Sequence, residues 1–311
     1  MGLDIAFWIL AIVSVVAAIG VVSLRNVFRA ALALVLCFLT VAGIYIIMAL
    51  SFYLPFMTGQ ISLGQAGFMA VGAYASAVCT VKFGIPYVPS VLIGGIVAGI
   101  VGFVLGVPAL RIKGIYLLLL TLGFGEIVRV IFINLNYVGA AAGFPNIPYQ
   151  KHTLLYAYGT VLILIIFFHR LRQSRMGRAF QAIGNDEGAA EIVGVNIMAA
   201  KLTAFSVGAF IAGIGGGIFA HYQEYIEPLM FGVMHAVEFI VFTIFGGIQI
   251  FWGPIFGAFV LTFMPEFFRV IQTWRMELYG VLLIVMMIIR PQGVIGLDTI
   301  QGLKRLFQKV H

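Results

Sequence analysis

The sequence predicts an all-α polytopic membrane protein with about ten transmembrane helices, an inverted repeat and broken helices. First, 62% of the 311 residues are hydrophobic and only 9% are charged, whereas an average soluble domain has about 25% charged residues. Second, uncharged stretches long enough to cross a bilayer, about 20 residues each, recur along the chain. Third, glycine and proline interrupt these stretches in both halves. The composition therefore excludes a soluble fold.

The apolar stretches are expected to be helices, because lipid offers the backbone no hydrogen-bond partners. The alternating pattern of about ten residues that marks transmembrane strands is absent from the sequence. We expect a single transmembrane domain over residues 1–311. Its ten predicted spans cover residues 5–23, 31–50, 60–80, 88–109, 114–133, 153–169, 203–220, 237–250, 253–269 and 276–289.

The basic residues predict the topology. Lysine and arginine gather in residues 170–202, the longest loop between spans, and in the carboxyl-terminal tail, residues 297–311. Because basic loops stay in the cytoplasm, we expect both segments there. Arg25 and Arg29 fit this topology less well, since it places them outside.

Two glycine-rich segments, residues 58–68 and 245–258, break the helical pattern at what the sequence suggests are corresponding points of two halves. The halves are spans 2–5 and 7–10, which run in opposite directions under this topology. Paired interruptions in opposed halves are typical of an inverted repeat with a transport path near the bilayer midplane.

Gln60, Ser62 and Gln65 stand among glycines in the first break. Uncharged polar side chains in an apolar segment face other helices or water, and glycine allows close approach or unwinding there. We interpret the two breaks as a polar substrate path; the alternative is that small residues only tighten helix packing. The predicted path comprises Gly59, Gln60, Ser62, Gly64, Gln65, Gly67, Gln249 and Gly253.

Glu126 and Arg129 are ionisable residues inside a predicted span, spaced to share one helix face. Such residues are functional candidates, yet a mutually neutralising pair can also hold helices together. We expect this pair to be structural. No metal site is predicted, although His221 with Glu224 and His235 with Glu238 repeat a ligand-like spacing, because Pro228 and Gly232 separate them.

The loop 170–202 has the composition of an amphipathic helix interrupted by glycines. It is too polar to insert and too apolar to be a solvated tether, so it should dock onto a protein partner or lie on lipid. Gly188, Ala189 and Ala190 would permit close approach. The sequence has no Gly-x-x-x-x-Gly-Lys-Ser/Thr phosphate loop; if ATP drives this protein, another subunit hydrolyses it.

Four blocks resemble the permease family of ATP-binding-cassette importers for branched-chain amino acids, and specifically its M-type member. The blocks are residues 59–68 continuing to 72–74, 121–129, 177–194 and 290–293, and the resemblance extends from about residue 40 to 296. Two segments depart from the family pattern. Residues 137–144 lack a Thr-Gly-Gly run, and residues 184–187 replace a more charged version of the loop.

The resemblance implies a multi-pass permease of the bacterial inner membrane that imports leucine, isoleucine, valine or similar amino acids by alternating access. It implies four kinds of neighbour: an H-type permease, two cytoplasmic ATP-binding subunits, an extracytoplasmic substrate-binding protein and the bilayer. The chain itself is expected to be no enzyme and to hold no cofactor. The ATPase coupling residues implied are Gly177, Glu187, Gly188, Ala189, Ala190 and Gly194.

Two other functions remain as alternatives. Importers for urea or short-chain amides use similar permeases. An ion-coupled secondary transporter would need an intramembrane carboxylate pair, which the sequence does not show.

Overall fold

The computed structural model describes residues 34–112 and 114–267, together with the isolated residues 32, 280, 284, 293 and 294. The first predicted span (5–23), nearly all of the tenth (276–289) and the predicted tail (297–311) lie outside the described residues.

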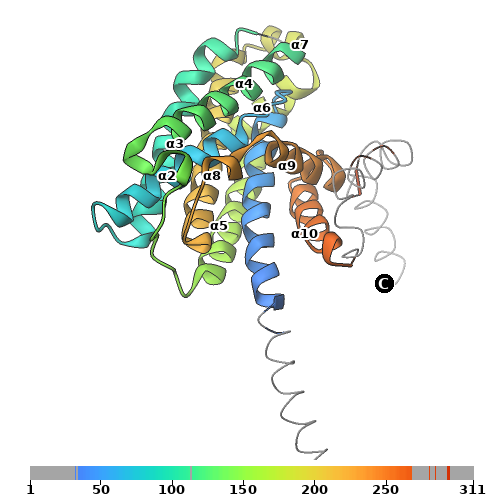
Figure 1. The fold of residues 1–311 in the computed structure, drawn as a ribbon. Helices are drawn as coiled ribbons and strands as arrows, with labels where there is room; N and C mark the ends of the chain where they lie inside the picture. Colours follow the sequence, from blue (N-terminus) through green and yellow to red (C-terminus); the bar gives the residue numbers. More distant parts are fainter. Residues whose placement is uncertain are drawn as a thin grey trace, which may run out of the picture.

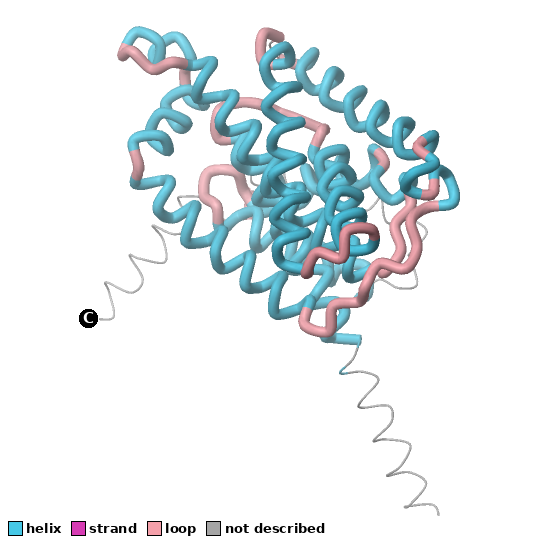
Figure 2. The backbone as a smooth tube through the Cα atoms, turned by 90° about the vertical axis from the view of Figure 1, so that its left-hand side faces the viewer, coloured by secondary structure: helices cyan, strands magenta, loops and turns pink. Residues whose placement is uncertain are grey.

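The described chain is a bundle of helices (Figures 1 and 2). It begins with the helix Leu34–Phe56, drawn in blue without a label in Figure 1. The helices that follow are α2 (Gln65–Val81), α3 (Tyr87–Ala109), α4 (Ile115–Asn134), α5 (Thr153–Gln173), α6 (Arg175–Asn185), α7 (Glu187–Ile192), α8 (Ile197–Gln223), α9 (Val233–Gly246) and α10 (Trp252–Phe267). Short 3₁₀ turns are η1 (Asn136–Val138), η2 (Ala140–Ala142) and η3 (Pro228–Phe231).

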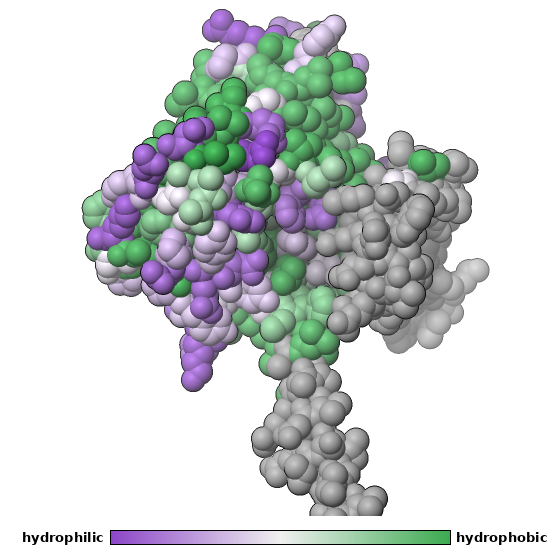
Figure 3. Space-filling view, viewed as in Figure 1, coloured by the Kyte–Doolittle hydropathy of each residue, from purple (hydrophilic) through white to green (hydrophobic). Residues whose placement is uncertain are grey.

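Within the described ranges, six helices are long and apolar enough to cross a membrane, and α2 and α10 are shorter apolar helices. Figure 3 shows a broad hydrophobic area on this face of the molecule. Large apolar side chains remain exposed on several helices, for example Val104, Ile115 and Ile163 at 64%, 69% and 67%. A bilayer covers such a surface, so the predicted all-α polytopic membrane fold is confirmed.

The centre of the bundle is the packing of α2 and α3 against α8, and glycine makes it possible. A Cβ atom on Gly72 would overlap the backbone of Gly213, and one on Gly94 would lie 2.5 Å from the carbonyl oxygen of Gly72. A Cβ on Gly216 would overlap the backbone of Met69. Small residues let membrane helices approach this closely and gain van der Waals contact, because lipid supplies little hydrophobic drive for association.

Several predicted boundaries agree with the structure. The helices α3 and α4 begin and end within one residue of the predicted spans 88–109 and 114–133. In contrast, α2 begins at Gln65 instead of residue 60, because the chain turns through Gly59 at a φ of +74°. The helix α8 begins at Ile197, six residues before the predicted 203, where Asn196 Oδ1 accepts a hydrogen bond from Ala199 N at 3.0 Å.

The predicted correspondence between the two breaks is wrong. Residues 57–64 join the first described helix to α2, whereas residues 247–251 join α9 to α10. The breaks thus follow the first helix of one set and the second helix of the other. The interruption before α9, residues 224–232 with η3, is the one that matches the first break in chain order. The inverted repeat itself stays a prediction.

The predicted docking loop forms two helices, α6 and α7, which lie at one end of the bundle (Figure 1). Ser174 Oγ accepts a hydrogen bond from Gly177 N at 3.1 Å and caps α6. Asp186 Oδ1 accepts one from Ala189 N at 3.0 Å and caps α7. These caps satisfy amide groups that lack partners within each helix, so the loop has a defined shape.

Candidate functional site

Three polar residues of the first break, Gln60, Ser62 and Gln65, lie inside the protein, whereas Gly59 is exposed. Gln60 is 2% exposed, and Ser62 and Gln65 are each 1% exposed. Their polar atoms therefore meet protein groups, and the contacts show what each residue supports.

Gln60 connects the break to the start of α8. Its Nε2 donates to Thr58 Oγ1 at 2.7 Å and to the carbonyl oxygen of Lys201 at 3.1 Å. Beside it, a Cβ on Gly184 of α6 would overlap the carbonyl oxygen of Met57. The beginning of the break thus packs directly against α6, at the end of the molecule that the predicted topology places in the cytoplasm.

The remaining polar groups support the unwound backbone. Ser62 Oγ accepts from Gly64 N at 3.2 Å, and Thr121 Oγ1 of α4 accepts from Leu63 N at 3.0 Å. Ser51 Oγ donates to Gln65 Oε1 at 3.5 Å, while Gln65 Nε2 is buried without a partner. A buried amide group of this kind carries a desolvation cost of about 1–3 kcal/mol.

Glycine brings α2 against α4 just beyond the break. A Cβ on Gly67 would lie 3.0 Å from the Cα of Gly125 and 3.1 Å from the ring of Phe124. This is the packing role that small residues play between membrane helices. The sequence alone left two roles open for the glycines of the break, helix packing and a substrate path. In the structure, Gly67 packs α2 against α4.

A small void follows, where the first turns of α2 and α9 meet α4. It has about 10 Å³ of free volume, and its lining is Leu63, Ala66, Leu122, Gly125, Glu126, Phe231, Gly232, Val233 and Ala236. Such a volume holds about one water molecule. Glu126 is the only charged residue in this lining.

Glu126 and Arg129 form the predicted ion pair. Arg129 Nε and Nη2 donate to the same carboxylate oxygen, Glu126 Oε2, at 2.8 and 2.5 Å. The side chain of Glu126 remains 31% exposed and that of Arg129 remains 28% exposed. The ion pair is therefore formed as expected, but both side chains remain partly exposed on the surface of this chain.

The second break divides the predicted path further. Gly253 belongs to the contact between α9 and α10, because a Cβ there would overlap the carbonyl oxygen of Gly247. Gly293 also packs on this turn: a Cβ on it would overlap Gly247, and Val294 N donates to the carbonyl oxygen of Phe245 at 3.0 Å. Gln249 lines a cavity.

That cavity, of about 350 Å³, lies between the second break and α6. Its lining is Tyr53, Phe56, Met57, Arg172, Gln181, Gly184, Asn185, Ile248 and Gln249. Gln60 and Gln249 are thus both found near α6, whereas Gly253 serves helix packing. The substrate path through these residues stays a prediction.

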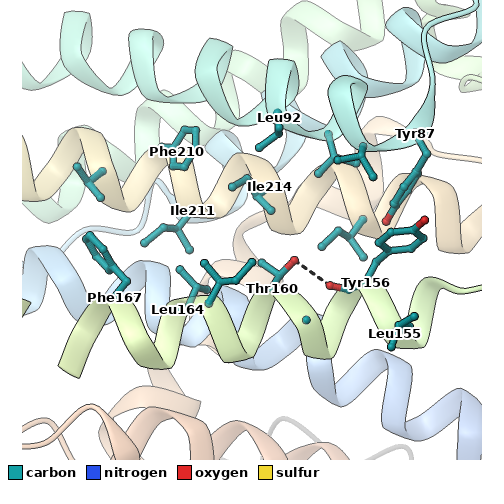
Figure 4. A pocket seen from close by; sticks show the side chains of 16 residues that line it. Tyr87, Leu92, Leu155, Tyr156, Thr160, Leu164, Phe167, Phe210, Ile211 and Ile214 are labelled. Atoms are coloured by element: carbon teal, nitrogen blue, oxygen red, sulfur yellow. Dashed lines mark hydrogen bonds between the residues drawn. The ribbon is translucent and has the colours of Figure 1, made fainter. Parts of the chain in front are cut away.

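A second cavity, of about 570 Å³, lies among α3, α5 and α8 (Figure 4). Its lining is mostly aliphatic and aromatic, and Thr160 Oγ1 uses its hydrogen bond on the carbonyl oxygen of Tyr156 at 2.8 Å. Unpaired charges in such surroundings cost several kcal/mol or more. The lining is unsuited to a charged solute.

The coupling residues implied by the resemblance divide into two groups. Gly188, Ala189 and Gly194 are exposed, and Glu187 forms an ion pair with Lys201 that ties α7 to α8. Gly177 and Ala190 are buried, and Ala190 is only 3% exposed. A partner surface could approach the first group directly, whereas Ala190 packs within this chain.

Sequence reasoning missed the exposed apolar pair Ile192 and Val193. They are 88% and 82% exposed at the end of α7. The signal was present, since two adjacent aliphatic residues precede a glycine in the amphipathic loop. Exposed aliphatic side chains next to polar ones are typical of a surface that binds another protein.

The histidines of the two ligand-like pairs make hydrogen bonds with protein groups. His221 shares hydrogen bonds with the carbonyl oxygen of Gly217 at 2.8 Å and with Thr80 Oγ1 at 3.2 Å. His235 Nδ1 lies 3.0 Å from Glu238 Oε2. In the part of the chain that the structure describes, no group of three such side chains could hold a metal ion.

Comparison of the sequence with known proteins identifies a family and several relatives. Residues 34–290 match the family described as branched-chain amino acid transport system, permease component. The chain is 30% identical over 299 residues to the high-affinity branched-chain amino acid transport system permease protein LivM of Escherichia coli (strain K12), covering 84% of this chain and 70% of that protein.

The LivM protein of Salmonella typhimurium is likewise 30% identical, over 297 residues, with 84% of this chain and 70% of that protein covered. A more distant similarity, 24% identity over 209 residues, is to the fructose import permease protein FrcC of Rhizobium meliloti, covering 62% of this chain and 57% of that protein. No solved structure matches the chain significantly.

Proposed function

Because the chain belongs to the family of permease components of branched-chain amino acid transport systems, we propose that it forms one half of a two-permease path through the membrane. It is an M-type permease and a multi-pass protein of the bacterial inner membrane. Its relatives are permease subunits of ATP-driven transporters. The urea or amide importer and the ion-coupled transporter have less support than this family membership.

The observation that carries the proposal is the arrangement of α6 and α7 beside the transmembrane bundle. The two capped helices present exposed Ile192 and Val193 outward, while Gly184 packs on the backbone at Met57. A partner that pushes on this unit would thereby move the first break and, through Gln60, the start of α8. This is the physical requirement for using ATP hydrolysis in one subunit to reshape another.

The proposed partners are an H-type permease, two cytoplasmic ATP-binding subunits that dock on α6 and α7, and an extracytoplasmic substrate-binding protein. In this assembly the chain hydrolyses no ATP and needs no cofactor. The nucleotide binds to the partner subunits, which drive alternating access.

The proposed substrate path follows the first break, residues 59–67, toward Gln249. The buried amide group of Gln65 supports this proposal, because Gln65 Nε2 lacks a partner in the described structure. A passing solute with a carboxylate could accept that hydrogen bond.

Reconstitution tests the proposed function. The chain should be assembled with its genomic neighbours in proteoliposomes, and uptake of labelled leucine, isoleucine and valine compared with uptake of urea and acetamide. We expect ATP-dependent uptake of the amino acids only. Uptake of urea or acetamide in preference to leucine would refute the substrate assignment, and uptake without ATP would refute the transporter class.

Substitution of Gln65 tests the proposed path. Gln65→Leu should lower leucine uptake about fivefold, by removing roughly 1 kcal/mol of hydrogen bonding from a passing solute, while complex yield and basal ATP hydrolysis remain. Thr262→Val is a matched control, because this buried hydroxyl bonds to the backbone of its own helix, at the carbonyl oxygen of Ala258. Unchanged uptake in Gln65→Leu would show that Gln65 only packs helices.

A further inference from the structure

The ion pair of Glu126 and Arg129 lies deep within a membrane-spanning helix. The helix α4 runs from Ile115 to Asn134, so at 1.5 Å per residue Glu126 is about 16 Å from one end and about 12 Å from the other. The hydrocarbon core is about 30 Å thick. The carboxylate therefore lies close to the middle of the bilayer, too far from either surface to reach water by extending its side chain.

The helix that carries the pair is poorly covered by the rest of the chain. Only 22% of the apolar stretch of α4 is buried, less than in any other membrane-capable helix of the described ranges. The neighbours Ile127, Val130 and Ile131 are 60%, 50% and 54% exposed. Aliphatic residues are stable against lipid or another subunit, but partly exposed charges are costly in hydrocarbon.

The pair also retains hydrogen-bonding capacity. Both bonds from Arg129 end on Glu126 Oε2, and within the described residues Glu126 Oε1 and Arg129 Nη1 have no hydrogen bond. A pair that served only to join helices would hydrogen-bond to a second helix. Within the described residues the hydrogen bonds of this pair are internal, and Glu126 borders the small void at Phe231 and Ala236.

We propose that Glu126 and Arg129 line the transport path and offer paired charges to the ammonium and carboxylate groups of the transported amino acid. This inference rests on the proposed function and assigns that function a pair of substrate-contacting residues. The guanidinium binds the carboxylate of the amino acid through two N–H groups, and Glu126 binds its ammonium group.

The ion pair and the amino acid each carry one positive and one negative charge, so each charge of the pair has a partner on the amino acid. When the amino acid enters, each partner exchanges one ionic contact for another, so no unpaired charge is left at the middle of the bilayer. When it leaves, Glu126 and Arg129 close on each other again. The exchange keeps binding weak, which favours release over retention.

Three variants in the reconstituted assembly test the proposal: Glu126→Gln, Arg129→Gln and the charge swap that combines Glu126→Arg with Arg129→Glu. Leucine uptake should fall about tenfold or more in all three, the change expected for the loss of roughly 1.4 kcal/mol. Complex yield and the ATP hydrolysis stimulated by the loaded binding protein should stay within about twofold of normal in the swap. Leu119→Ala, at an exposed position of the same helix, should leave uptake unchanged.

The swap separates contact with substrate from a structural role. A structural pair is restored when its charges exchange places, so full recovery of uptake in the swap would overturn the proposal. Normal uptake in either single variant would overturn it as well. Leucine uptake by the unmodified assembly is measured on the same plate, so a wrong substrate class is recognised separately by the absence of uptake before any substitution is made.

Discussion

Replacing Ile192 and Val193 together by glutamate is expected to prevent the proposed ATP-binding subunits from associating with this permease. The two side chains are 88% and 82% exposed at the tip of the docking loop, where a partner would desolvate them. Two carboxylates in their place would be buried without partners, and we expect association to weaken at least about a hundredfold. Co-purification of tagged permease with its ATP-binding subunits measures this loss.

The matched control is Ile192→Val with Val193→Ile, which keeps an aliphatic surface. It should preserve both co-purification and uptake. Membrane insertion of the glutamate variant should be normal, because the exposed side chains make no contribution to the core of the bundle. Normal co-purification of the glutamate variant would show that the subunits dock elsewhere.

Ala190→Arg should behave differently from the glutamate variant. Ala190 is 3% exposed and its backbone amide bonds to the carbonyl oxygen of Asp186, so an arginine there must displace α7 itself. The Ala190→Arg substitution should disorder the loop, and the variant should therefore lose the ATP-binding subunits. Limited proteolysis should cut the variant between α6 and α8. A protease-resistant Ala190→Arg loop would contradict this explanation.

Gly72→Leu is expected to abolish folding of the permease. A side chain on Gly72 overlaps the backbone of Gly213, and backbone cannot move aside without separating α2 from α8. Overpacking at this contact should cost roughly 3 kcal/mol or more. Detergent-solubilised protein should therefore aggregate, which size-exclusion chromatography with a fluorescent tag detects.

The control for this substitution is Gly159→Ala. A Cβ on Gly159 has no atom within 4 Å, so alanine fits and should add about 1 kcal/mol of helix stability. The two variants differ in packing although both replace a glycine in a membrane helix. A monodisperse peak for Gly72→Leu would show that the described contact between α2 and α8 is looser than its geometry indicates.

The sequence was sufficient for the helices whose ends coincide with the edges of an apolar run. At α3 the run starts after Pro86 and ends near Arg111, so hydropathy and turn residues mark the same limits. It was insufficient where a helix continues into water. The first turns of α8 include Lys201, and only the cap at Asn196 marks its start.

The candidate site was harder to predict because its contacts join distant parts of the chain. Gln60 was identified as a polar residue in an apolar segment, yet its partner is the backbone of Lys201, and no local pattern points to a carbonyl group so far along the sequence. Glu126 and Arg129 were predictable as a pair from their spacing. Their partial exposure depends on how little of the chain covers α4.

The glycine contacts of α2 and α3 with α8 can form only after α8 has been synthesised. About ninety residues separate the end of α3 from the start of α8, and a ribosome working at about 5–20 residues per second needs roughly 4–20 s to make them. During that interval the grooves at Gly72 and Gly102 are in the membrane without the helix that fills them. Slower synthesis of this stretch would prolong the exposure of the half-made protein to membrane proteases.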